Sequence, residues 1–462
     1  MANPAKHAPK ASFMSRRAFL TGTAVCLSGT VAKASMKVAD LRGSIDSTEL
    51  GLLPNAVDDQ SAQFQNAVNR AVERGRALFL PAGTYPVANL RMPSGTLIVG
   101  VPGRTRLIYQ GGGGQLIRAE GVSNVGLTGI TFDGANRSIG DFTEGLLHFL
   151  GCRNISIDNC EVVGSAKMGL LLDRCSGRVE NTRVTGAAIA GIRSNEAKGL
   201  SITGNTVTDC ANGGIWVHRW SEGEDGTIVS GNRVERIGAR YGGTGQFGNG
   251  INVFRAHGVM ISNNRVADCA FSAIRSNSGS NVQIIGNSCL RSGETAVYSE
   301  FSFEGALIAN NIIDGGTMGI SIANFMDGGR LAVCSGNLIR NISETGPYPP
   351  EVAGFGIGIS AEADTTLTGN VIEGAPKYGI LIGWGPYMRN VVASQNVVRG
   401  CGTGIAVTVV DKAGSAVITN NIVQGSKNGA INGFKWLEKA TGELNNSSEF
   451  SNLTVRGNHI AA

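Results

Sequence analysis

Side chains that can bind sugars or move protons recur at fixed places in a repeated segment of this 462-residue sequence. A small residue and an alternation of apolar with other residues recur as Gly191-Ile-Arg-Ser, Gly214-Ile-Trp-Val, Ala273-Ile-Arg-Ser and Ala296-Val-Tyr-Ser. Alternation with a period of two predicts a strand in which the second and fourth residues after the small one point outward. The sequence therefore predicts two outward columns, and these columns carry the candidate site.

Four outward side chains are the candidate catalytic groups: Arg275, Tyr298, Glu300 and His218. A uronate lyase or epimerase needs a base beside the carbon next to the carboxylate, and a positive charge that stabilises the enolate-like intermediate. We expect Arg275 to bind the carboxylate or stabilise its enolate, Tyr298 to transfer a proton, and Glu300 to orient either one. His218 is a second group that can move protons.

Five further outward side chains are expected to bind the substrate: Arg193, Asn195, Trp216, Asn252 and Asn277. Aromatic faces stack on pyranose rings, whereas Arg and Asn bind hydroxyls or carboxylates. From residue 319 onward the outward residues are small, so the diversity is confined to one stretch. The alternative interpretation is an ordinary solvated face.

The predicted substrate is a polysaccharide or oligosaccharide, and lyase- or epimerase-like chemistry on a uronate-containing glycan is favoured. A glycoside hydrolase needs two carboxyls about 5–9.5 Å apart, and Glu300 has no acidic neighbour in its columns. A loop acid, such as Glu222, Asp225 or Asp327, would have to reach in. A non-catalytic carbohydrate-binding or cell-envelope scaffold protein and a glycoside hydrolase remain the alternatives. The scattered histidines predict no metal, and we expect no cofactor.

The repeat itself predicts the fold class. Most spacings in the strand series are 22 or 23 residues, and a second series, each member an Asn before an apolar pair, runs in step with it. Units this short must stack to bury their apolar faces. Strand alternation excludes helical repeats. Leucine-rich repeats are excluded because the sequence lacks their leucine framework. A parallel β-helix of about 11–13 coils, each about 4.8 Å above the last, remains.

Two insertions interrupt this spacing. Gly238–Asn249 and Ser343–Phe355 each lengthen the link into an outward strand. Because enlarged loops at such places can wall a groove, we expect them to border the polar face. Neutral drift of surface loops is the alternative explanation.

An amphipathic helix is predicted ahead of the repeats. Phe64, Ala67, Val68, Ala71 and Val72 follow helical spacing, and Leu78-Phe-Leu-Pro81-Ala-Gly83-Thr-Tyr85 follows the helix. With this opening the chain resembles the right-handed parallel β-helix proteins of the pectate-lyase-like superfamily, and is most similar to a twin-arginine-translocated repeat family of unknown activity. The resemblance implies a single-stranded right-handed parallel β-helix with an N-terminal capping helix. The calcium-binding Asp cluster of many pectate lyases and the Tyr-Gly-x-Asp-Pro-His motif of alginate epimerases are missing.

The N-terminus resembles a twin-arginine export signal. Arg16-Arg17 precedes a mild apolar stretch, and Ala32-Lys33-Ala34 matches the pattern that signal peptidase reads. We expect a signal peptide at 1–34, a linker at 35–57, the cap helix and first coils at 58–100, and repeats at 101–462. The protein should be periplasmic or secreted, exported folded from a bacterium by the twin-arginine machinery, with no membrane anchor after cleavage.

The basic pI does not indicate a nucleic-acid partner. The chain has 40 basic and 35 acidic residues. Five of the basic residues and none of the acidic ones lie in 1–34. Cleavage therefore leaves a balanced charge, and we expect no nucleic-acid binding.

Overall fold

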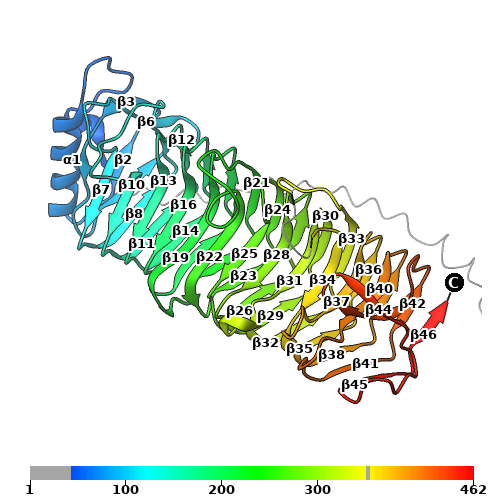
Figure 1. The fold of residues 1–462 in the computed structure, drawn as a ribbon. Helices are drawn as coiled ribbons and strands as arrows, with labels where there is room; N and C mark the ends of the chain where they lie inside the picture. The colour runs from blue at the N-terminus through cyan, green and yellow to red at the C-terminus, as the bar shows by residue number, and fades with distance from the viewer. Residues whose placement is uncertain (1–42, 350–353, 462) are drawn as a thin grey trace, which may run out of the picture. The chain divides into compact units, whose positions relative to one another are not determined.

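The computed structural model describes residues 43–349 and 354–461. Within them, three sheets of 16, 15 and 15 strands run along one stack (Figure 1). Neighbours within a sheet are, almost throughout, three strands apart in the chain and parallel, so each coil adds one strand to each sheet. The predicted all-β parallel β-helix is confirmed, and the stack is taller than the 11–13 coils expected because the early coils lack the Gly-Ile repeat. The expected signal segment lies outside the described residues.

We name the sheets A, B and C. Sheet A contains β1 (Ile45–Asp46), β2 (Leu78–Leu80), β5 (Leu97–Gly100), β8 (Ser123–Thr128), β11 (Arg153–Asp158), β14 (Gly177–Glu180), β17 (Leu200–Thr203), β20 (Ile228–Ser230), β23 (Met260–Ser262), β26 (Val282–Ile285), β29 (Glu304–Ala309), β32 (Arg330–Ser335), β35 (Ala363–Thr368), β38 (Arg389–Ser394), β41 (Ala416–Thr419) and β45 (Leu453–Arg456). Sheet B contains β3 (Gly83–Val87), β6 (Thr105–Tyr109), β9 (Thr131–Asp133), β12 (Glu161–Val163), β15 (Arg183–Thr185), β18 (Thr206–Thr208), β21 (Arg233–Ile237), β24 (Arg265–Cys269), β27 (Ser288–Leu290), β30 (Ile312–Gly316), β33 (Leu338–Ile342), β36 (Val371–Glu373), β39 (Val397–Arg399), β42 (Ile422–Gln424) and β46 (His459–Ala461). Sheet C contains β4 (Leu90–Arg91), β7 (Ile117–Glu120), β10 (Gly145–Leu150), β13 (Met168–Asp173), β16 (Ala190–Asn195), β19 (Gly213–Glu224), β22 (Asn249–His257), β25 (Ile274–Asn277), β28 (Thr295–Glu300), β31 (Met318–Ile322), β34 (Ile357–Ala361), β37 (Tyr378–Ile382), β40 (Thr403–Thr408), β43 (Ile431–Lys435) and the antiparallel β44 (Glu438–Glu443).

The interior of the stack is built from columns of apolar residues. Ile192, Ile215, Ile251, Ile274 and Val297 pair in register on successive strands of sheet C, and all are fully buried. The small residue before each Ile is explained by packing, because a Cβ at Gly214 would lie 2.2 Å from the Gly250 carbonyl oxygen. The inward column thus fixes which residues of each strand point outward.

A ladder of buried asparagines runs along the turns between sheets A and B. The Asn287 amide donates to the Ile261 carbonyl and to Asn311 Oδ1, each at 3.0 Å, and its Oδ1 accepts from Asn264. Bonds of this kind join Asn205, Asn232, Asn264, Asn287, Asn311, Asn337, Asn370, Asn396, Asn421 and Asn458.

Two asparagines that belong to the same sequence series, Asn159 and Asn181, lie outside the ladder. Both have a positive φ of 50° and are exposed. The ladder position next to Asn205 is held instead by Thr182, whose backbone N–H donates to Asn205 Oδ1.

The N-terminal end of the stack is closed by α1 (Ser61–Glu73), which lies at the blue end in Figure 1. Four of the five predicted apolar residues are buried, Phe64, Ala67, Val68 and Ala71, whereas Val72 is half-buried. Part of the segment expected to be a linker joins this cap. β1 pairs with β2, and Leu52 is fully buried. A short 3₁₀ helix, η1 (Ser47–Leu50), lies between β1 and Leu52 in the chain.

All eight cysteines of the described residues are buried and unpaired, so they act as small core side chains. Within the described residues, no helix is both long and apolar enough to cross a membrane. A second 3₁₀ helix, η2 (Phe325–Asp327), follows β31.

Candidate functional site

The pairing of β16, β19, β22, β25 and β28 confirms the two outward columns of the repeat. One column reads Arg193, Trp216, Asn252, Arg275 and Tyr298. The second column reads Asn195, His218, Phe254, Asn277 and Glu300. Sheet C thus brings every expected site residue onto one face, together with Phe254.

This face is covered rather than open. Trp216, expected to stack on a sugar, is 0% exposed. The reason is the 238–249 insertion: Phe247 packs against the Trp216 ring at 6.2 Å, and His218 stacks on it at 5.1 Å with an angle of 11°. No ring face of Trp216 is left for a ligand, which corrects the expectation of direct stacking.

Trp220, which the column pattern does not include, is the exposed aromatic of this region. Its side chain is 62% exposed, and its ring lies 5.4 Å from the guanidinium carbon of Arg193. It lies on β19 within the segment where the strand register shifts, between His218 and Gly223. The extra residues of His218–Gly226 are the signal that could have found it.

A cavity of about 140 Å³ lies between Trp220 and the 238–249 insertion. Four of the expected site residues line it, with two loop residues and two aromatic rings: Arg193, His218, Asn252, Asn277, Gly245, Gln246, Trp220 and Phe254. A hollow of about 280 Å³ adjoins it and shares Phe254 and Asn277. Asp327, one of the loop acids considered from sequence, lines this hollow.

Arg193 is buried but keeps one exposed partner. Its Nη1 lies 3.1 Å from Glu144 Oε2, and its Nε donates to Asn195 Oδ1 at 3.0 Å. The Glu144 side chain is 59% exposed. Burial lowers the pKa of Arg193, against the attraction of Glu144. The guanidinium is thus buried, while the carboxylate that pairs with it lies largely in solvent.

His218 is held neutral. Burial, followed by the positive charge of Arg193, lowers the pKa of His218 to about 3. The imidazole Nε2 lies 3.2 Å from Asn252 Oδ1, and Asn252 Nδ2 donates to the Gly245 carbonyl, which fixes the orientation of the amide. Nε2 accordingly carries the proton, so Nδ1 is the nitrogen with a free lone pair.

Arg275 is saturated by protein groups. It donates to both oxygens of Glu300, at 2.7 and 3.0 Å, and to Thr244 Oγ1 at 2.5 Å. Its guanidinium carbon lies 4.8 Å from the centre of the Tyr298 ring. The sequence predicts that the guanidinium of Arg275 is free to bind a uronate, whereas in the structure it forms a buried ion pair with Glu300.

Glu294 is the acidic neighbour that the columns do not reveal. It is 1% exposed, lies 3.7 Å from Arg275 Nη1, and accepts from Thr244 and from the hydroxyl of Tyr348 in the second insertion. It precedes β28 by one residue, outside both columns. The sequence does contain a feature that could have pointed to Glu294. It is acidic, whereas the equivalent positions of the adjacent coils are Phe271 and Thr317.

Burial sets the proton affinities in this second cluster. It raises the pKa of Glu300, although Arg275 opposes the shift, and raises the pKa of Tyr298 to about 12. Tyr298 therefore keeps its proton at neutral pH. Within residues 43–349 and 354–461, no group of three or more His, Cys, Asp or Glu side chains is placed to hold a metal ion.

Comparisons with known proteins bear on the fold. The N-terminal fragment of gene product 12 of bacteriophage phi29 matches with 17% identity and a TM-score of 0.53, over 85% of this chain and 71% of that one. The A-module of a mannuronan C-5 epimerase of Azotobacter vinelandii matches with 14% identity and a TM-score of 0.51, over 91% of this chain and all of that one. No curated protein sequence matches the chain. The model of the right-handed β-helix region matches residues 104–234 and 222–390, more than half of the sequence. The chain therefore belongs to the family of right-handed β-helix proteins.

Proposed function

We propose that this protein is exported and acts on a uronate-containing polysaccharide by lyase- or epimerase-like proton abstraction at Arg193 and His218. The observation that carries the proposal is the 140 Å³ cavity. The neutral imidazole of His218 and the exposed Trp220 line it, together with Arg193, whose partner Glu144 can be replaced. A mannuronan C-5 epimerase module with the same fold is consistent with a polysaccharide substrate.

Arg193 is the group that we assign to the substrate carboxylate. Its carboxylate partner Glu144 is 59% exposed, so Glu144 can turn away into solvent. A uronate carboxylate can take the place of Glu144 and bind the guanidinium by two parallel hydrogen bonds. Trp220 offers a ring face for stacking, and Asn277 offers an amide for hydroxyls.

His218 is the proposed base. The imidazole is neutral and can accept a proton at Nδ1, and the low pKa of His218 favours release of that proton again. The proton leaves the sugar carbon next to the carboxylate, and Arg193 stabilises the resulting enolate. Return of a proton to the opposite face gives the epimer, whereas loss of the neighbouring glycosidic oxygen gives an unsaturated end.

Arg275, Glu300 and Glu294, the Arg275 cluster, are proposed to hold a wall of the cavity in place and to take no part in the reaction. His218 and Glu300 are three coils apart in one column, about 14 Å, so they cannot act on the same sugar atom. Glu300 Oε1 accepts from Asn277 Nδ2 at 3.1 Å, and Asn277 lines the cavity. Through Asn277, the Arg275 cluster thereby holds one wall of the cavity.

The test is product analysis after incubation with a panel of acidic and neutral polysaccharides. New unsaturated ends identify a lyase, altered uronate stereochemistry identifies an epimerase, and new reducing ends alone identify a hydrolase. Arg193→Met should abolish turnover. Arg178→Met, which removes an exposed arginine of sheet A, should leave it unchanged.

A second pair of variants decides which cluster reacts. His218→Asn should abolish turnover, and Tyr298→Phe should retain it, because the two side chains lie three coils apart. The reverse result would move the chemistry to the Arg275 cluster. Binding without any product would identify a non-catalytic carbohydrate-binding protein instead.

A further inference from the structure

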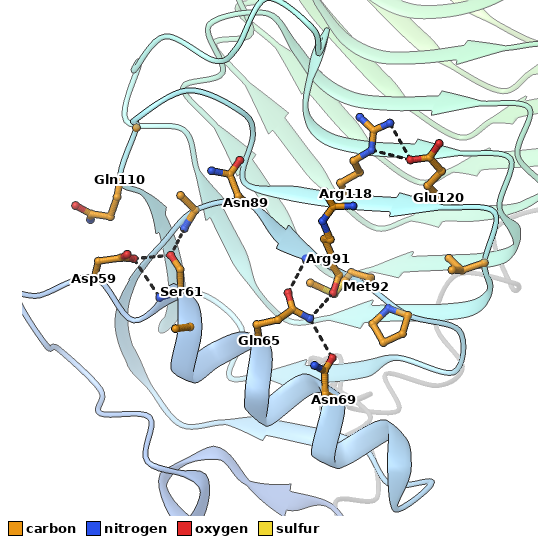
Figure 2. A pocket seen from close by; sticks show the side chains of 15 residues that line it. Asp59, Ser61, Gln65, Asn69, Asn89, Arg91, Met92, Gln110, Arg118 and Glu120 are labelled. Carbon is orange, nitrogen blue, oxygen red and sulfur yellow. Dashed lines mark hydrogen bonds and ion pairs between the residues drawn. The ribbon is translucent and has the colours of Figure 1, made fainter.

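A cavity of about 870 Å³ lies at the N-terminal end of the same molecule, outside the candidate site. Figure 2 shows Gln65 and Asn69 of α1 on one side of it, and Arg91, Arg118 and Glu120 of β4 and β7 on the other. Its size falls within the range of ligand sites, about 300–1,000 Å³. It is therefore large enough to hold part of a sugar chain.

The cavity and the candidate site share one face of sheet C. Arg91, Arg118, His148, Leu171 and Arg193 pair in register on successive strands, so Arg91 and Arg118 belong to the same outward column as Arg193. Arg118 and Arg193 are three coils apart, about 14 Å at one strand spacing per coil. This distance is within the reach of one extended chain, which has to pass over the side chains that cover the buried His148 and Leu171.

The lining carries two arginines, Arg91 and Arg118, and two acids, Asp59 and Glu120, so its formal charges balance and an anion is favoured only beside Arg91. Arg91 and Arg118 are direct neighbours on paired strands, a like-charge arrangement that is unfavourable unless something neutralises it. Arg118 donates to Glu120 at 2.9 Å, whereas no carboxylate among the described residues pairs with Arg91. Asp59, the other acid of the lining, is engaged by the backbone N–H of Ser61 at 3.1 Å. One guanidinium is thus left for a ligand.

The remaining polar lining is rich in amides, which both donate to and accept from sugar hydroxyls. Gln65, Asn69, Asn89 and Gln110 contribute them. Gln65 is held in place by two bonds to the backbone of Arg91, each at 2.8 Å. The wall next to Arg91 is therefore preorganised.

We propose that this cavity is a second glycan-binding site. It holds an acidic segment of the same polysaccharide chain whose reacting sugar lies at Arg193. The identity of the glycan rests on the proposed function, but the site is defined by its own residues. Arg91 and Arg118 bind a uronate carboxylate, and the amides bind hydroxyls. Long chains gain affinity from both places, whereas short ones occupy only one.

The experiment compares oligouronates of two lengths, one too short and one long enough to span the roughly 19 Å from Arg91 to Arg193. Arg91→Met/Arg118→Met should weaken binding of the long oligomer about tenfold, and turnover of the short oligomer should stay unchanged. Arg178→Met is the matched control, because Arg178 and Glu180 form the same i, i+2 pair on β14 of sheet A. Arg91→Met alone removes an exposed side chain and guards against a folding defect in the double variant.

The outcomes separate this site from the proposed function. Unchanged binding of the long oligomer by Arg91→Met/Arg118→Met overturns the second site and leaves the proposed function standing. Loss of oligomer binding in Arg91→Met/Arg118→Met but not in Arg193→Met supports the second site and contradicts the proposed reaction centre. A parent protein that binds neither oligouronate overturns both.

Discussion

Arg275 shows how a residue can be placed correctly by sequence and still have a different environment. The repeat puts it beside Tyr298 and near Glu300, as the pairing of β25 with β28 confirms. Because the side chains of Arg275, Glu300 and Glu294 are less than 10% exposed, Arg275 is the cation of a buried pair. In such a site, the removal of one partner costs more than the pair contributes, because it leaves a charge buried and uncompensated.

Arg275→Met should therefore destabilise the protein by about 3–5 kcal/mol, since Glu300 and Glu294 lose their common partner. Arg340→Met, which removes an exposed ion pair with Asp314, should cost less than about 1 kcal/mol. Denaturant unfolding of both variants measures the difference. Equal losses would show that the Arg275 pair is exposed to solvent.

His218 should make stability depend on pH. Its pKa is about 3 in the folded protein and about 6.5 in an unfolded chain, so between these values only the unfolded chain binds the proton. Stability must then fall as the pH falls from 6.5 toward 3, by up to about 1.4 kcal/mol per pH unit.

The check is the slope of unfolding free energy against pH, measured between pH 4 and 7, roughly the range in which unfolded histidine titrates. His218→Asn should flatten the slope relative to the parent protein. His459→Gln changes an exposed histidine and should leave the slope unchanged. A parent slope that His218→Asn does not alter would mean that the imidazole is open to water.

At the scale of elements, the strands of sheet C and their register follow from the 22- or 23-residue period. The period fixes which side chains share a column, and so the relation of Arg193 to Trp216 or of Arg275 to Tyr298 is predictable. The paths of the insertions are not, because no repeat constrains them. Burial of Trp216 by Phe247 and contact of Tyr348 with Glu294 both depend on those paths.

The asparagine ladder is the element whose loss should be most damaging. Asn287→Ala removes four hydrogen bonds and deprives the buried backbone N–H of Asn264 of its partner, at a cost of at least about 3 kcal/mol. Asn428→Ala changes an exposed asparagine and should stay within about 0.5 kcal/mol. Thermal unfolding of the two variants tests the ladder, and similar midpoints would contradict its role.

At the scale of the whole molecule, the fold is compatible with export in the folded state. The eight cysteines of the described residues are buried and unpaired, so the fold needs no oxidising compartment. Residues 61–73 close the first coil, as terminal caps of solenoids do. A stack of this kind can therefore form completely in a reducing compartment.

Changing both Arg16 and Arg17 to Lys should leave folded precursor in the cytoplasm, because the twin-arginine machinery reads that pair. Fractionation of cells that produce the parent protein and the double variant measures this. The thermal midpoint of the retained protein should match that of the mature protein with and without reductant. Unimpaired export of the double variant would exclude the twin-arginine route.

In the proposed reaction, His218 abstracts the proton next to a uronate carboxylate that Arg193 binds. Incubation of oligouronates with the protein in deuterium oxide measures this directly, because both lyase and epimerase chemistry begin with the same abstraction. The parent protein and Arg178→Met should give deuterium at that carbon or a product that has lost its proton, and Arg193→Met and His218→Asn should give neither. Equal exchange or elimination with Arg193→Met would contradict the claim, as would intact substrate with the parent protein.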